Sequence, residues 1–208
     1  MILGLGLALL AHQRVRGIGF FRTVFSSTVA TSVAVASVMW ITLLNPQIGL
    51  INYYLGTNID LLTDPTWALV AVSATTVWLS LGVTFIVMSA GLQGVPEDML
   101  EAATVDGAGP WMRFRKVTLP LLSPTLLFSL VVLTINAFQS FGQIDLLTQG
   151  GPNGKTDVIV YNLVQTSRQV PGRAAAQAVV LFLIIFTLTL VQLRFLERRV
   201  HYEGGVGG

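Results

Sequence analysis

Long apolar stretches without an ionisable side chain dominate the chain and alternate with shorter polar segments. Asp, Glu, Lys, Arg and His are absent from residues 23–59, 65–96, 117–144 and 174–193. A helix that crosses a bilayer needs about 20 apolar residues, and a charge at its centre costs about 2.5–3.5 kcal/mol on insertion scales. Each segment is long enough for one crossing. The pattern therefore predicts an all-α, polytopic membrane protein.

Within one transmembrane domain of residues 1–208, we place full spans at about 23–44, 66–90, 121–143 and 175–193. The apolar residues 1–11 are too few to cross a bilayer, and no basic segment precedes them as in a signal peptide. We expect them to be the second half of a span whose beginning is missing, so that the chain is N-terminally truncated. An interfacial anchor is the alternative.

Composition supports a membrane protein and excludes several site chemistries. Hydrophobic residues make up 53% of the chain and charged residues 11%, whereas soluble domains carry about 25% charged residues. The chain has no cysteine, and its two histidines, His12 and His201, lie at opposite ends. We therefore expect no thiolate or histidine metal site.

The distribution of basic residues predicts the orientation. Loops 12–22, 91–120 and 194–208 carry nine Lys and Arg residues, and loops 45–65 and 144–174 carry three. Because basic loops stay in the cytoplasm, the first set is predicted to be cytoplasmic in a multi-pass protein of the cell membrane. The sequence pI of 9.3 then reflects topology and does not indicate nucleic-acid binding.

One segment imitates a nucleotide-binding loop. Residues 150–156 contain Gly-Lys-Thr, but the Walker A spacing requires a glycine where Gln149 stands. A proline also interrupts the loop, and the topology places it outside the cell. We therefore do not interpret it as a phosphate site.

The predicted cytoplasmic loop 91–120 reads as two short helices joined by a turn. Pro96, Glu97 and Asp98 favour a helix start, because proline suits the first turn and acids favour the positive end of the helix dipole. We expect this helix to end before Gly107 and a second one to cover 111–117. A rigid elbow of this kind can transmit force from a cytoplasmic partner, and an ordinary well-capped loop is the alternative.

The same loop resembles the EAA loop of ABC-importer permeases. Glu101-Ala102-Ala103, Gly107 and Val117-x-Leu119-Pro120 have that loop's spacing, with Val117 where isoleucine is usual. The resemblance implies a coupling helix that sits in a cleft of an ABC ATPase dimer. The implied contact residues are Glu101, Ala102, Ala103, Asp106, Gly107, Leu119 and Pro120.

By this resemblance the chain is a transport subunit without catalytic residues or a cofactor of its own. ATP and Mg would be bound by the partner ATPase. A second homologous permease, an extracytoplasmic solute-binding protein and membrane lipid would be the other partners.

Further motifs resemble the carbohydrate-uptake branch of these permeases. They include Gly17-x-Gly19-Phe20-Phe21-Arg22-Thr23 and Leu147-Thr148-x-Gly150-Gly151-Pro152. Residues 138–145 are most similar to permeases for glycerol-3-phosphate and glycerophosphodiesters. Many sugar permeases have Asp where this chain has Gly142, so both a sugar and a glycerol-3-phosphate-type solute stay open.

Polar side chains within the third predicted span suggest a solute pathway. Asn136, Gln139 and Gln143 recur at i, i+3 and i+7 beside Ser140, so a continuous helix would present them on one face. Substrate contact and helix packing are both open for this row. For a row of hydroxyls in the second span we favour helix packing. That row comprises Ser73, Thr76, Ser80 and Thr84.

The leading functional hypothesis is thus a permease subunit in which ATP binding by a partner drives alternating access. An ion-coupled secondary transporter is one alternative, although such proteins usually bury ionisable residues at mid-membrane. A membrane scaffold that does not transport is the other.

Overall fold

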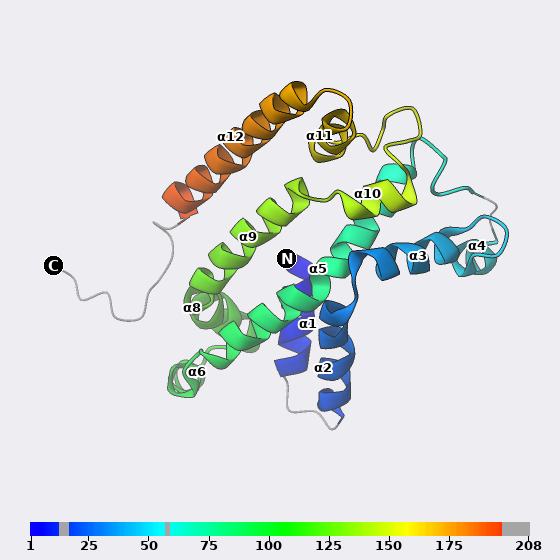
Figure 1. The fold of residues 1–208 in the computed structure, drawn as a ribbon. Helices are drawn as coiled ribbons and strands as arrows, with labels where there is room; N and C mark the ends of the chain where they lie inside the picture. The colour runs from blue at the N-terminus through cyan, green and yellow to red at the C-terminus, as the bar shows by residue number, and fades with distance from the viewer. Residues whose placement is uncertain (13–16, 57–58, 197–208) are drawn as a thin grey trace. The chain divides into compact units, whose positions relative to one another are not determined.

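The computed structural model describes residues 1–12, 17–56 and 59–196, and their regular structure is entirely helical. Figure 1 shows these helices in chain order. The predicted all-α membrane class is confirmed. The longer helices are α1 (Ile2–His12), α2 (Ile18–Ser27), α3 (Val33–Leu44), α5 (Ala68–Gln93), α6 (Glu97–Val105), α9 (Ser123–Phe138), α11 (Ile159–Ser167) and α12 (Pro171–Leu196); the short ones are η1 (Thr28–Ala30), α4 (Leu50–Leu55), α7 (Pro110–Arg113), η2 (Phe114–Thr118), α8 (Leu119–Leu121) and α10 (Gly142–Leu147).

Two helices of the described chain, α5 and α12, are each long and apolar enough to cross a membrane. Two bent pairs pass the same test only when each pair is counted together: Ile18–Ala30 with Val33–Leu44, and Pro110–Leu121 with Ser123–Phe138. At about 1.5 Å per residue, the 11 residues of α1 are too short to span. By length and composition, the described part of the chain therefore has two candidate spans, or up to four if each bent pair forms one span.

The first predicted span is a broken helix. Its two parts meet at a bend of 107°, at Thr31 and Ser32, which both have extended backbone. The Ser32 hydroxyl accepts a hydrogen bond from the Val35 backbone N–H at 3.2 Å and so caps α3. Serine and threonine favour such breaks because their hydroxyls offer backbone groups a local partner.

The third predicted span also differs from one continuous helix. Helix α9 ends at Phe138, and α10 begins at Gly142 after an irregular turn. The Ser140 hydroxyl donates to the Asn136 carbonyl at 3.1 Å, and the Phe141 N–H donates to the Gln139 carbonyl at 2.8 Å. These bonds replace the helical ladder at that point.

The chain forms two compact units, and the first contains Met1–Ser26, Leu81–Thr134 and Thr187–Gly208. Its core joins α1 to the second half of α5. The buried side chains are Ala8, Ala11, Phe85, Met88, Leu92 and Leu122. Gly4 of α1 lies so close to α5 that an added Cβ would be 2.5 Å from Thr84 Cγ2. Small residues at such a contact allow helix backbones to approach closely.

The second unit contains Ser27–Ser80 and Ile135–Phe186. Its core comprises Leu44, Ala71, Val72, Ile144, Leu147 and Tyr161. Helix α10 packs on α3, and an added Cβ on Gly142 would be 2.9 Å from Val33 Cγ1. The side chain of an aspartate at this position would clash with α3. Close packing between α10 and α3 therefore explains the glycine at position 142.

The predicted outer loop 45–65 is held by local caps. Asn45 Oδ1 accepts hydrogen bonds from the Gln47 and Ile48 backbone N–H groups before α4 begins. Asp60 caps the turn that follows α4. A hydrogen bond from the Thr63 side chain, with further bonds from the Leu62 and Thr63 backbone, lowers the pKa of Asp60 below its ordinary value against the opposing effect of burial. This loop therefore contains local structure and is not an open connection.

Candidate functional site

The first helix predicted within loop 91–120 is present as α6. It begins after Pro96, carries Glu97 and Asp98 in its first turn, and ends at Val105. Acids in this turn complement the positive end of the helix dipole. The preceding Val95 is buried, which ties the start of the helix to the first unit.

Gly107 ends α6 in a Schellman motif. Its φ is +79°, in the left-handed region. The Ala108 N–H donates to the Ala103 carbonyl at 2.9 Å, and the Gly107 N–H donates to the Thr104 carbonyl at 3.0 Å. This is the bond pair that defines the motif. The left-handed backbone conformation at this helix end therefore explains why the EAA pattern has a glycine at position 107.

Replacing Gly107 with alanine is expected to loosen the end of α6. A Cβ at Gly107 would meet no atom within 4 Å, so the cost is purely conformational, about 1–2 kcal/mol. Faster hydrogen exchange at the Ala108 amide would report the change. Gly109→Ala is the matched control, because Gly109 is equally unobstructed and has a φ of −67°. Equal acceleration in both variants would contradict the αL explanation.

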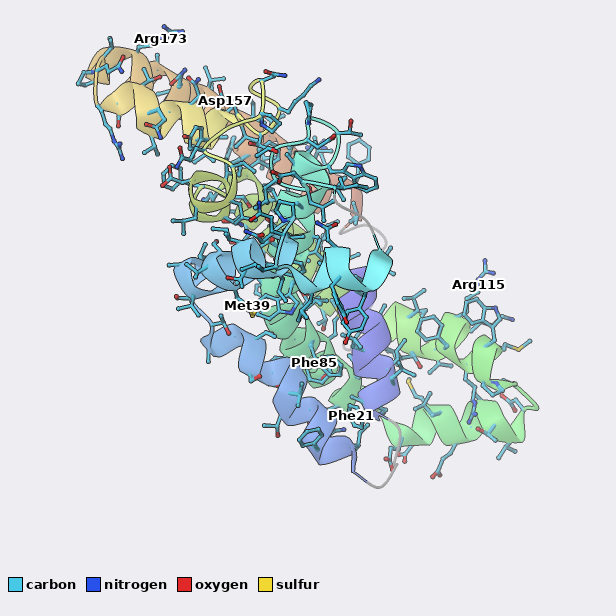
Figure 2. All side chains as sticks on the ribbon, turned by 90° about the vertical axis from the view of Figure 1, so that its right-hand side faces the viewer. Phe21, Met39, Phe85, Arg115, Asp157 and Arg173 are labelled. Atoms are coloured by element: carbon cyan, nitrogen blue, oxygen red, sulfur yellow. The ribbon has the colours of Figure 1, made fainter. Side chains whose placement is uncertain are left out.

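The second arm of the elbow is a continuous helical run from α7 through η2 to α8. The Arg113 guanidinium donates to the Thr104 hydroxyl at 2.8 Å and so joins this arm to α6. Trp111 packs on Phe114 with ring centroids 5.6 Å apart. Figure 2 shows Arg115 projecting away from this run. The two arms therefore form one tied hairpin.

The hairpin connects to the core of the first unit through Leu122. Pro120 lies just before the 66° bend that separates Pro110–Leu121 from α9. Leu122 sits at the bend, is fully buried, and packs in the cluster that contains Phe85 and Met88 of α5. A displacement of the hairpin must therefore move α5 or open this core, because close-packed interiors transmit strain.

The predicted contact residues differ in exposure. Glu101, Ala102, Asp106 and Gly107 are exposed, whereas Ala103, Leu119 and Pro120 are half-buried. Within the described chain, the Glu101 carboxylate makes no hydrogen bond or ion pair. Val105, one turn after Glu101, is 88% exposed, and Trp111 on the other arm is 71% exposed. The hairpin thus presents an acid among exposed apolar side chains.

The predicted polar row does not lie on one helix. Asn136 and Gln139 are exposed near the end of α9, and Ser140 is in the turn. Gln143 belongs to α10, is buried, and donates from Nε2 to the Thr76 hydroxyl of α5 at 3.1 Å. The one-face interpretation required a continuous helix from 136 to 143, and the turn at 139–141 breaks it. The side-chain amides of Asn136 and Gln139 have no hydrogen-bond partner within the described ranges of the chain.

Sequence reasoning missed the contacts that join distant segments. No sequence pattern pairs Arg113 with Thr104 or Gln143 with Thr76, although each pair forms a side-chain hydrogen bond. Gln192 of α12 likewise donates from Nε2 to the Thr134 hydroxyl of α9 at 2.8 Å. The sequence does contain one signal for such contacts, which is an isolated Asn or Gln in an apolar helix. Because an unpaired amide in lipid is costly, such a side chain is expected to find a hydrogen-bond partner on another helix.

A hairpin tied to apolar helices of membrane-spanning length defines an integral membrane protein. The chain belongs to the family of binding-protein-dependent transport system inner membrane components, whose family model matches residues 1–202. The predicted resemblance to inner-membrane permeases of ABC importers is confirmed, as is localisation in the inner membrane. The family decides against the ion-coupled transporter and the scaffold.

Relatives of this chain include sn-glycerol-3-phosphate transport system permease proteins UgpA. The protein of Agrobacterium fabrum is 40% identical over 211 residues, which cover 97% of this chain and 72% of that protein. The proteins of Rhizobium meliloti and Escherichia coli are 38% and 37% identical, covering 97% and 98% of this chain and 72% and 71% of those proteins.

Two solved structures share the fold. A bacterial ABC transporter involved in import of the acidic polysaccharide alginate matches with a TM-score of 0.80 at 23% identity, over 94% of this chain and 72% of that one. The bacterial alginate ABC transporter in complex with an alginate pentasaccharide-bound periplasmic protein matches with a TM-score of 0.74 at 24% identity, over 94% and 70%.

Proposed function

We propose that this chain couples ATP binding by a partner ATPase dimer to alternating access, with the α6–α8 hairpin as the coupling element. The proposal rests on the structural connection between the exposed Glu101 on α6 and the packed core of the first unit around Leu122. Glu101 lies on a helix that a Schellman motif and the Arg113–Thr104 bond hold in place. The hairpin then enters the core at Leu122. A partner that moves α6 therefore acts on α5 and α9 together.

The exposed chemistry of the hairpin supports a protein contact there. Val105 and Trp111 expose apolar surface on the same hairpin as the Glu101 carboxylate, which has no partner among the described residues. Exposed apolar groups rimmed by polar residues are typical of interaction sites. The complementary partner surface is an apolar cleft with a basic group for Glu101. ATP and Mg belong to that partner, and this chain contributes no bond-making step.

The assembly follows from the same role. A solute-binding protein delivers the solute from outside, in line with the family's binding-protein dependence. A second homologous permease completes the pathway, and two ATPase subunits power it. Residues 1–202 match a single family model, which supports one permease domain that covers both compact units.

For the solute, we favour a small hydroxylated anion of the glycerol-3-phosphate type over a neutral sugar. The relatives named for sn-glycerol-3-phosphate are 37–40% identical over nearly the whole chain. Asn136 and Gln139 offer open amides for hydroxyl groups near the end of α9.

Asn136→Leu and Gln139→Leu are each expected to weaken solute affinity about threefold to tenfold, the effect of one lost hydrogen bond between neutral groups. The measurement is the solute dependence of uptake in proteoliposomes. Association with the ATPase should stay unchanged, because neither residue lies in the hairpin. Gln169→Leu, at an exposed amide outside α9, is the control. Equal loss of affinity and of assembly would point to misfolding and contradict a pathway role.

The proposal as a whole is tested by co-purifying the chain with its candidate ATPase and permease partners. Glycerol-3-phosphate presented by the binding protein should stimulate ATP hydrolysis in proteoliposomes, and a neutral sugar should not. Stimulation by a neutral sugar alone would overturn the solute class and leave the coupling role intact. Failure of the chain to associate with any ATPase would overturn the coupling role.

A further inference from the structure

A cavity of about 450 Å³ lies beside α11 and the first turns of α12, away from the coupling hairpin in the sequence. Four of its lining side chains are polar: Asp157, Asn162, Arg173 and Gln177. Figure 2 labels Asp157 and Arg173 in this part of the chain. The lining thus supplies one cation, one anion and two amides.

A chain of hydrogen bonds orders the wall of this cavity. Gln177 donates from Nε2 to Asn162 Oδ1 at 2.9 Å, and Asn162 donates from Nδ2 to Asp157 Oδ2 at 3.1 Å. Gln177 Oε1 is buried and accepts no hydrogen bond from the residues that the structure describes. Arg173 makes no ion pair with Asp157 within the part of the chain described. Counter-charges for Arg173 and Asp157 are therefore unfilled among the residues that the structure describes.

An apolar cavity of about 410 Å³ adjoins the polar one. The two share Asp157, Val158 and Ile159, and the second extends to Phe138 and Leu181. Helix α12 continues beyond Arg173 without an ionisable residue until Arg194. In a membrane protein this places Arg173 at the end of the apolar stretch, at the depth of lipid headgroups. The paired cavities match an amphipathic molecule in polarity.

We propose that these cavities bind a phospholipid with a phosphoethanolamine headgroup. Arg173 contacts the phosphate, and the Asp157 carboxylate contacts the ammonium group. An acyl chain covers Phe138 and Leu181. Charge complementarity selects this headgroup, because a purely anionic one would face the Asp157 carboxylate and a choline one has no N–H to donate. A soluble solute would leave the apolar cavity exposed to water.

Native mass spectrometry of the purified full chain tests the proposal. The protein is titrated with phosphatidylethanolamine, phosphatidylglycerol and phosphatidylcholine that carry identical acyl chains, and with glycerophosphoethanolamine as the chain-free headgroup. We expect phosphatidylethanolamine to bind at least about fivefold more tightly than the other three, the effect of one partly exposed charged contact. Equal binding of the three lipids would overturn the proposal, and so would equal binding of the chain-free headgroup.

Two variants locate the site. Arg173→Gln and Asp157→Asn are each expected to lower phosphatidylethanolamine affinity about fivefold, and Asp157→Asn should also reduce the preference over phosphatidylglycerol. Arg168→Gln is the matched control, because Arg168 follows α11 and does not line the cavity. Far-UV circular dichroism verifies that each variant is folded. Unchanged binding in both cavity variants, or an equal loss in Arg168→Gln, would overturn the assignment.

Discussion

Replacing Glu101 with lysine is expected to abolish solute uptake in proteoliposomes while the protein still inserts and folds. Glu101 is exposed on α6 and has no partner within the described chain, so the change costs little in the isolated subunit. A like charge brought against a basic group of the ATPase costs several kcal/mol, which corresponds to a hundredfold or greater loss. Uptake and ATPase co-purification are measured together.

Asp98→Lys is the matched control for this charge reversal, because Asp98 is an exposed acid on the same helix. It should retain most of the uptake. An equal loss in both variants would show that the net charge of α6 matters and not the contact at Glu101. Full uptake in Glu101→Lys would contradict the coupling role directly. Glu101→Gln should fall between the two, since it removes the attraction without adding repulsion.

Replacing Gly91 with leucine is expected to destabilise the first unit by about 3 kcal/mol, because overpacking a filled contact forces backbones apart. Gly91 is in α5, and an added Cβ would be 2.7 Å from both Leu122 Cδ1 and Thr125 Oγ1. The contact joins α5 to the point where the hairpin enters the core. A lower melting temperature in detergent and weaker coupling of ATP hydrolysis to uptake would report the change.

Gly6→Leu provides the control for Gly91→Leu. Gly6 is also helical, and its added Cβ would meet no atom within 4 Å. The same substitution there should be neutral or slightly stabilising, because glycine in a helix costs roughly 0.5–1 kcal/mol relative to alanine. If Gly6→Leu destabilised as much as Gly91→Leu, the close approach of α5 to Leu122 would not be the cause.

The α6–α8 hairpin was predictable in outline from its own residues. Helix caps, acids at the first turn and a glycine stop act within a few residues, so the bounds of α6 follow from local sequence. The tie between Arg113 and Thr104 was not predictable, because many side chains on two short helices could pair. The burial of Leu122 was also not predictable from the sequence, because nothing distinguishes this leucine from the others in the same apolar segment.

The polar row shows where periodicity fails. Asn136, Gln139 and Gln143 have helical spacing, and that spacing was sufficient only while the helix continued. The turn at Gln139–Phe141 contains no proline or glycine that would indicate a helix break in the sequence. Gln143 is consequently turned into the second unit, where the Thr76 hydroxyl satisfies its amide. The same bond supports a packing role for the hydroxyl row at Thr76.

The sequence by itself determined the membrane class, the four apolar segments and the position of the helical hairpin in loop 91–120. These depend on the absence of charge over long stretches and on motifs whose residues are close together in the chain. Only the tertiary structure decided that Gly91 and Gly142 are close contacts, that Leu122 anchors the hairpin, and that Asp157 and Arg173 line one cavity. Each of these depends on packing between separate segments, and no local pattern specifies which side chains will meet.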